Sequence, residues 1–188
     1  MKMIILLGSP RKGANSETLA RKVAEGFGGD VDYVRLNNLT IRPCRGCGGC
    51  DKTGGCIIDD DMSILYTSVD NADRVVLVSP VYFYGLSAQC KTFGDRFQAR
   101  WARKYLLKKR FREGEGRKGY LLSTAATRGS KIFACSVLTT KYIFDAMDID
   151  YGGEMLVKGV DHRKALLDYP ERLAEAVKFG RDIDAGII

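Results

Sequence analysis

Four cysteines lie within thirteen residues, at Cys44, Cys47, Cys50 and Cys56. Their spacing is C-x2-C-x2-C-x5-C, and several glycines stand between them. Because glycine adopts backbone conformations that other residues avoid, this stretch of chain can fold around one small centre. Thiolates gathered in this way are typical ligands of iron–sulfur clusters. The cysteine-rich loop from 43 to 57 therefore predicts redox or metal chemistry.

Three states of these cysteines remain open from the sequence. A [4Fe–4S] cluster is favoured, because the first three cysteines come at successive three-residue steps, as at the start of a bacterial ferredoxin run. Zinc is the second, although structural zinc sites usually pair two C-x2-C knuckles across a longer stretch. Thiols that bind no metal, either reduced or forming a disulfide switch, are the third. Arg42, Arg45 and Lys52 would favour thiolates in every case.

The composition of the 188-residue chain is that of one domain with a full core, since 45% of its residues are hydrophobic. No apolar run approaches the roughly 20 residues that span a bilayer. The apolar start, Met1–Leu7, is too short for a signal sequence, so we expect a cytoplasmic protein with no membrane partner. Clustered cysteines then favour metal or redox chemistry over structural disulfides. The isolated Cys90 and Cys135 are expected to be buried core residues of helices.

The net charge is +7, and ten cations lie between Arg96 and Lys118. This run indicates either an ordinary solvated face or a landing site for an acidic partner or a phosphate-bearing ligand. No groove-reading motif accompanies the charge, so we expect no nucleic acid to bind. The single histidine, His162, is expected to be solvated. The run Asp59–Asp61 is expected to cap a helix rather than to hold a metal.

Apolar runs and helix-periodic segments alternate along the chain. Strands are expected at 3–7, 31–36, 75–78, 120–122 and 150–157, with the second strand near the sheet edge. Helices are expected from about 16, from 59 to 69, around 93–101, over 132–147 and from about 168. Asn15 or Ser16 should cap the first helix and Asp168 the last. This alternation predicts a flavodoxin-like α/β fold over 1–188, a five-stranded parallel sheet of order 2-1-3-4-5 with helices on both faces.

Three loops of unusual composition follow expected strands, at 8–16, 79–86 and 123–130. Ligands of open α/β sheets bind beyond the carboxyl ends of the strands, where these loops begin. The first loop brings glycines, hydroxyls and Arg11 to the start of a helix, where backbone N–H groups and the helix dipole favour a phosphate. An ordinary strand–helix turn is the alternative. The first loop is not a nucleotide P-loop, because Ala14-Asn15 replaces the Lys-Ser/Thr pair.

The aromatic residues of the second loop suit a planar heterocycle, and the polar third loop could bond a ring edge. The three loops in this order resemble the NADPH-dependent FMN reductase family, and the cysteine run narrows the resemblance to its iron–sulfur flavoproteins. The resemblance covers nearly the whole chain. It implies that the FMN phosphate is held by Ser9, Arg11, Asn15 and Ser16. It implies that the ring and ribityl chain contact Pro80, Val81, Tyr82, Phe83, Tyr84, Gly85, Ser123, Thr124, Ala125, Thr127 and Gly129. It also implies that the four cysteines hold a [4Fe–4S] cluster.

The expected function is that of an FMN-dependent oxidoreductase that passes electrons between the cluster, FMN and an external partner. No catalytic acid–base pair stands out, and flavin chemistry requires none. A ferredoxin-type carrier would dock on Arg96–Lys118, and a quinone or an oxygen species would be the small acceptor. Cluster and flavin should be neighbours, within one chain or across a subunit contact, because the cysteine loop follows the second strand. The resemblance also implies a homodimer or homotetramer.

Two alternatives remain open. The first is a cluster-free NAD(P)H-dependent FMN or quinone reductase, in which NAD(P)H is the donor. The second is not an enzyme but a redox-sensing or zinc-stabilised flavodoxin-like module. Iron and sulfide analysis with an absorption spectrum would separate the three.

Overall fold

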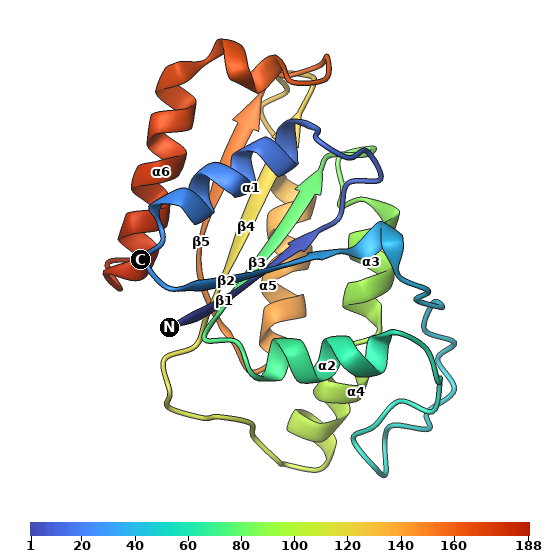
Figure 1. Cartoon of the computed structure of the whole chain (residues 1–188). Coiled ribbons are helices and arrows are strands. Elements are labelled where there is room, and N and C mark those ends of the chain that lie inside the picture. The colour runs from blue at the N-terminus through green and yellow to red at the C-terminus, as the bar shows by residue number, and fades with distance from the viewer.

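The computed structural model describes residues 1–188 and contains one sheet with all strands parallel. Its strands are β1 (Lys2–Leu7), β2 (Asp30–Arg35), β3 (Arg74–Pro80), β4 (Lys118–Ala125) and β5 (Asp150–Lys158). Their order is β2-β1-β3-β4-β5, so the predicted topology is confirmed, including the edge position of the less apolar β2 (Figure 1). No helix is both long and apolar enough to span a bilayer.

Helices cover both faces of the sheet (Figure 1). Helices α1 (Asn15–Gly26) and α6 (Pro170–Asp184) lie on one face. The other face carries α2 (Met62–Asp70), α3 (Ala88–Asp95), α4 (Gln98–Trp101) and α5 (Ala134–Ala146). Three short turns complete the fold: η1 (Leu36–Asn38), the π-helical η2 (Ala102–Leu106) and η3 (Ala165–Asp168).

The central strands supply both hydrophobic cores, because successive side chains of a strand point to opposite faces. In β1, Ile4 and Leu6 join the core under α2–α5. Met3, Ile5 and Leu7 join the core under α1 and α6. This is why the strand reads as one continuous apolar run, as expected for a parallel sheet covered on both sides.

Helices α1 and α6 approach each other closely at two glycines. A Cβ atom on Gly26 would lie 2.0 Å from the Val177 carbonyl oxygen, and one on Gly180 would lie 1.9 Å from the Val23 carbonyl oxygen. Neither position has room for a side chain, so both glycines allow backbone-to-backbone packing. The crossing fixes the direction of α1, whose first turn follows the loop 8–16.

Several local predictions were wrong. The caps of α1 and α6 are Ala14 and Tyr169, which bond no N–H through a side chain. The segment expected as one helix around 93–101 divides into α3, α4 and the π-turn. Cys90 is buried as predicted, whereas Cys135 is exposed, because it lies on the outer side of α5.

The basic run from 96 to 118 is not a continuous solvated face. Arg96 and Arg117 are buried. Three further cations of the run are largely buried in ion pairs: Arg100 with Asp70, Lys104 with Asp145, and Arg112 with Asp73. Because most of these cations are neutralised within the fold, the run is mainly a structural network. Within the run, only Lys108 and Lys109 are both exposed and without an ion pair.

Candidate functional site

The three loops that follow β1, β3 and β4 meet around a cavity of about 210 Å³ at the start of α1. Its lining includes eight residues expected from the sequence: Ser9, Arg11, Asn15, Ser16, Pro80, Val81, Tyr82 and Thr124. Five more line it without having been named individually: Ala14 and Ala126 within the predicted loops, and Val160, Asp161 and Arg163, which were missed. The three missed residues come from the segment after β5. Its position beside α1 could not be read from local patterns, although β5 ends at the same rim of the sheet.

Buried serines hold these loops together beneath the cavity. Ser87 Oγ donates to the Gly8 carbonyl oxygen at 2.7 Å, and the Ser87 N–H donates to Ser79 Oγ at 2.9 Å. Ser123 Oγ donates to the Ser79 carbonyl oxygen at 2.8 Å. All three hydroxyls are buried and bonded. The structure therefore places Ser123 in the support of the loops, while its neighbour Thr124 lines the cavity.

The start of α1 has the properties of an anion site. Its first N–H groups receive no side-chain cap, and Arg11 lies beside them, exposed, in the same cavity. Ser16 Oγ is buried and has no hydrogen-bond partner. A buried hydroxyl without a partner is unusual, because its desolvation is left uncompensated. An oxygen-rich anion at the helix start would supply the missing partner, so these residues fit a phosphate group.

Asn15 lines the same cavity, but its side chain is already engaged. Nδ2 donates to the carbonyl oxygens of Val160 at 3.2 Å and His162 at 2.9 Å, and Oδ1 accepts from the Leu166 N–H at 3.1 Å. These bonds fasten the segment after β5 to the first turn of α1. They also explain why Asn15 does not cap the helix. The single histidine, His162, has an exposed side chain, as expected.

A buried carboxylate supports the loop from behind. Glu17 accepts the Gly13 N–H at 2.6 Å and pairs with Arg35 at 2.6 Å and Arg21 at 2.9 Å. Burial raises the pKa of Glu17, but the bonds from Arg35, the Gly13 amide and Arg21 outweigh that effect and lower it to about 2. The carboxylate is therefore ionised at neutral pH. Sequence reasoning missed it, since a glutamate in the first turn of a helix is ordinary.

The expected ring loop ends in a tight turn that projects into solvent. The N–H of Tyr82 donates to the Gly85 carbonyl oxygen at 3.0 Å, and the reverse bond measures 2.9 Å. Both residues between them have positive φ, 48° at Phe83 and 64° at Tyr84, as in a type I′ turn. Bulky aromatic residues rarely adopt this conformation, and Phe83 is fully exposed. Backbone strain of this kind gathers at ligand sites.

The third loop contributes unevenly to the cavity. Thr124 lines it, Ala125 is buried, and Thr127 lies outside its lining. Gly129 lies against the aromatic turn, because a Cβ atom there would be 2.9 Å from Tyr84 Oη. The second and third loops therefore touch at their tips.

The four cysteines line a second cavity, of about 190 Å³, together with Arg96. Cys44 and Cys47 are exposed, and Cys50 and Cys56 are half-buried. Their thiols form a suitable donor set for a cluster or a soft metal. No group of three His, Cys, Asp or Glu side chains is arranged to hold a metal ion, so the sulfur atoms share a cavity without converging on one point.

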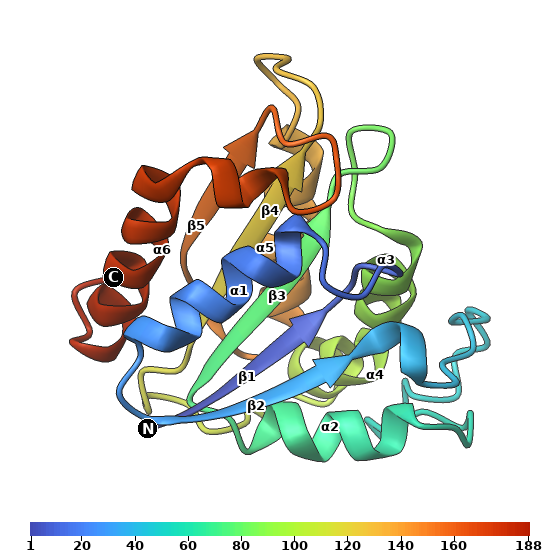
Figure 2. The same cartoon turned by 45° about the horizontal axis from the view of Figure 1, so that its top comes forward.

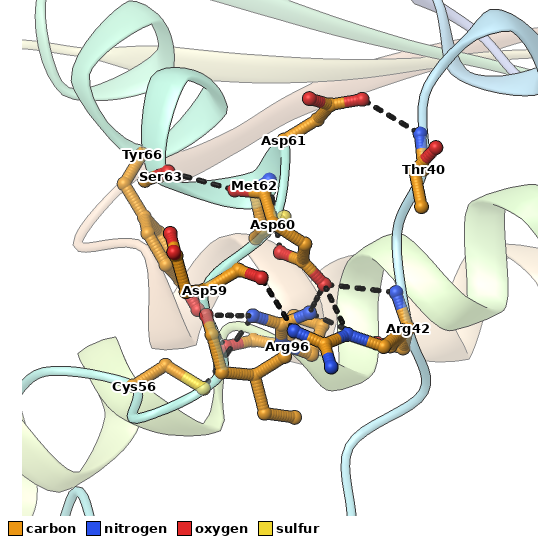
Figure 3. A network of polar contacts seen from close by, with 11 residues as sticks. Thr40, Arg42, Cys56, Asp59, Asp60, Asp61, Met62, Ser63, Tyr66 and Arg96 are labelled. Carbon is orange, nitrogen blue, oxygen red and sulfur yellow. Dashed lines mark hydrogen bonds and ion pairs between the residues drawn. The ribbon is translucent and has the colours of Figure 1, made fainter.

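A polar network closes the base of the cysteine loop (Figure 3). The two ends of the loop are joined where the Thr40 N–H donates to Asp61 Oδ2 at 2.7 Å and the Arg42 N–H donates to Asp60 Oδ2 at 2.9 Å. Asp60 Oδ1 also accepts the Met62 N–H at 3.1 Å. The expectation that the aspartate run caps α2 is met in part: Asp60 accepts the first N–H of the helix, whereas the N-cap residue Asp61 bonds across the loop and caps no N–H with its side chain.

The two cavities share no lining residue. They lie toward opposite ends of α3, whose N-cap Ser87 bonds Gly8 and whose C-cap Arg96 lines the cysteine cavity. In Figure 2 the cysteine-rich loop lies at the right of the molecule, whereas the loops that follow β3 and β4 project from its top. The eight residues of α3 span about 12 Å at about 1.5 Å each. Within one chain the two cavities are therefore separate, and the expectation that cluster and flavin are neighbours, within one chain or across a subunit contact, stays a prediction.

The comparisons with known proteins agree with this architecture. A family model described as NADPH-dependent FMN reductase matches residues 1–151. An iron–sulfur flavoprotein of Archaeoglobus fulgidus is 42% identical over 99 residues, 51% of this chain and 45% of that protein. A second one from the same organism is 34% identical over 149 residues, 78% of this chain and 73% of that protein.

The chain spans about half the length of the first of these relatives and of two further iron–sulfur flavoproteins, which it covers to 52% and 51%. Among solved structures, an NAD(P)H:quinone oxidoreductase from Methanothermobacter marburgensis superposes with a TM-score of 0.70 at 15% identity, over 98% of this chain and 97% of that one. This likeness confirms the flavodoxin-like fold. On the family match and the iron–sulfur flavoprotein relatives together, the chain belongs to the NADPH-dependent FMN reductase family.

Proposed function

We propose that this chain is an FMN-dependent oxidoreductase whose four cysteines hold a [4Fe–4S] cluster that exchanges electrons with the flavin. The observation that carries the flavin assignment is the buried, unpartnered Ser16 hydroxyl at the uncapped start of α1. It marks a place for an anionic oxygen within a cavity formed by the three loops. Family membership supports FMN as the ligand that supplies this anion.

The protein's part is to bind and orient the two groups. In this proposal Ser16, Arg11 and the first N–H groups of α1 hold the phosphate, while Pro80, Val81 and the aromatic turn flank the ring. Bound FMN supplies one-electron and two-electron chemistry, whereas a [4Fe–4S] cluster passes single electrons. Helix α3 then sets the separation between the two sites, since its ends contact both.

One observation favours a second candidate, a cluster-free FMN or quinone reductase with NAD(P)H as the donor. The cysteine sulfurs line one cavity but are not arranged as a ligand group for a metal. The spacing of the cysteines argues against this candidate, because four cysteines within thirteen residues are typical of a metal or redox site. The names of the relatives also support the cluster.

Anaerobic purification followed by absorption spectroscopy and iron, sulfide and flavin analysis tests the proposal. We expect one FMN and about four irons and four sulfides per chain, as a [4Fe–4S] cluster requires. Flavin without iron would leave only the cluster-free reductase as a candidate. Zinc or a disulfide without turnover would support the non-enzymatic module, and a protein that refuses FMN would reject both enzymatic candidates.

The external partners are part of the same proposal. A ferredoxin-type carrier or NAD(P)H would donate or accept electrons, and a quinone or an oxygen species would be the small acceptor. The exposed, unpaired Lys108 and Lys109 replace the whole basic run as the docking candidates. Lys108→Gln/Lys109→Gln should slow ferredoxin-linked turnover at low salt, whereas Lys178→Gln on α6 should not. Equal rates would reject this docking face, and light scattering would test the proposed homodimer or homotetramer.

A further inference from the structure

The largest fully buried side chain of the protein is that of Arg96, at the C-cap of α3. A guanidinium is almost never fully buried unless it is paired, because removing its charge from water is unfavourable. Arg96 does not line the cavity at the start of α1. The cavity that Arg96 lines is that of the four cysteines.

The side-chain hydrogen bonds of Arg96 go to Cys56 in the cysteine-rich loop and to residues that flank the loop on both sides, Arg42, Ile58 and Asp60 (Figure 3). Nη1 donates to Asp60 Oδ2 at 2.6 Å and to the Arg42 carbonyl oxygen at 2.9 Å. Nη2 donates to the Ile58 carbonyl oxygen at 3.3 Å and lies 3.5 Å from Cys56 Sγ. One guanidinium thus joins both arms of the loop and contacts one of its four cysteines.

The contacts give the guanidinium a defined orientation. Asp60, whose side chain is also buried, pairs with Nη1 of Arg96, and Nη2 faces Cys56. Nε is buried without a partner. Hydrogen bonds to cysteine sulfur and the net charge nearby are two of the factors that set the potential of an iron–sulfur cluster. Beside Cys56, Arg96 supplies the hydrogen bond to sulfur, and Arg96 and Asp60 supply charges of opposite sign.

Arg100 provides an internal comparison. It follows Arg96 by one helical turn and is also mostly buried. It makes two bonds to Asp70, at 2.6 and 3.4 Å, and its guanidinium carbon lies 4.5 Å from the centroid of the Tyr66 ring. None of its bonds reaches the cysteine loop. Its loss would remove similar packing and pairing without touching a cysteine.

We propose that Arg96 is a positioning residue of the cysteine site, which braces the loop, fixes Cys56 through an N–H···S hydrogen bond and, balanced by Asp60, raises the reduction potential of the cluster. The part about potential rests on the proposed function, since it requires the cluster. The bracing part does not.

The two halves of the pair predict opposite effects on the potential. In Arg96→Gln the Asp60 carboxylate stays near Cys56 without its buried cation, so the midpoint potential should become more negative. In Asp60→Asn the guanidinium keeps its charge without a counter-ion, so the potential should become more positive. Arg96→Lys should fall between Arg96→Gln and the wild type, and Arg100→Gln should leave the potential unchanged. Spectroelectrochemical titration under argon, with EPR of the reduced cluster, measures all of these.

A role limited to packing cannot produce shifts of opposite sign from two partners of one ion pair. Shifts of the same sign in Arg96→Gln and Asp60→Asn, or no shift in either, would therefore overturn the role in potential. If Arg96→Gln does not fold, Arg96→Lys and Asp60→Asn still decide the sign.

Hydrogen exchange on the metal-free proteins tests the bracing separately. Arg96→Gln should accelerate exchange of the Arg42 and Met62 amides, which donate to Asp60, by about tenfold or more, while Arg100→Gln should not. Unchanged exchange would overturn the bracing. If the wild-type protein never takes up iron, the proposed cluster and the role of Arg96 in its potential are both rejected. Hydrogen exchange would then test the bracing of the loop by itself.

Discussion

Replacing Glu17 by glutamine tests how the loop before α1 is held. The carboxylate is almost fully buried, accepts the Gly13 N–H and pairs with two arginines. The pKa of Glu17 falls from 4.5 to about 2 on folding. Because a change of one in pKa corresponds to about 1.4 kcal/mol, ionised Glu17 stabilises the fold by about 3 kcal/mol. We expect Glu17→Gln to lower the free energy of unfolding by about that amount at pH 7.

The pH dependence gives the sign. The folded pKa lies below the unfolded one, so the stabilisation is complete above about pH 4.5 and disappears as the pH falls toward 2. Linkage leaves less than half of it at pH 3. Urea unfolding of wild type and variant at pH 7, 4 and 3 should therefore show a difference in unfolding free energy that narrows steadily.

Glu25→Gln is the matched control on the same helix. Its carboxylate is 58% exposed and pairs only with Lys22, so its loss should change the unfolding free energy by no more than about 0.5 kcal/mol at any pH. A Glu17→Gln deficit that is the same at pH 7 and pH 3 would refute the reasoning, because it would show that packing and not ionisation is responsible.

Three further changes test the cavity and the fold. Ser16→Ala should weaken FMN binding about tenfold or more, as measured by flavin fluorescence. It should leave the unfolding free energy unchanged, because Oγ has no partner in the free protein. An unchanged Kd would exclude Ser16 from the phosphate site. Phe83→Asn/Tyr84→Gly should raise the unfolding free energy by about 1–3 kcal/mol while weakening FMN binding, because Asn-Gly suits the positive φ angles; a less stable double variant would argue against strain. Gly180→Ala should lower the unfolding free energy by about 1–3 kcal/mol in thermal unfolding, since the added Cβ would meet the Val23 carbonyl oxygen. An unaltered Tm would mean that α1 and α6 separate easily.

The sheet order and the three loops were predictable from the sequence, because each depends on local information. Apolar runs mark strands that are buried on both faces, and the alternation with helices limits the topology to very few solutions. The loops then follow at the carboxyl ends of the strands. The same logic recovered much of the cavity lining, including Ser9, Ser16 and Thr124.

The remaining features depend on partners that are distant in the chain. Arg96 lies in a run of cations that reads as solvated, and its burial follows from Asp60, which is 36 residues away. Asn15 resembles a helix cap, but the carbonyl oxygens that occupy its amide are about 145 residues away. Helix α5 exposes Leu138 and Tyr142 as well as Cys135, so its apolar residues do not reveal which side faces the core.

The tether made by Asn15 has a consequence for how the protein retains its cofactor. Its three partners lie beyond residue 151, where the match to the family model ends. The first turn of α1 is thus hydrogen-bonded to a region that lies outside the match to the family model. By thermodynamic reciprocity, whatever loosens the carboxy-terminal region should hasten the escape of flavin, and a retained flavin should in turn keep that region folded.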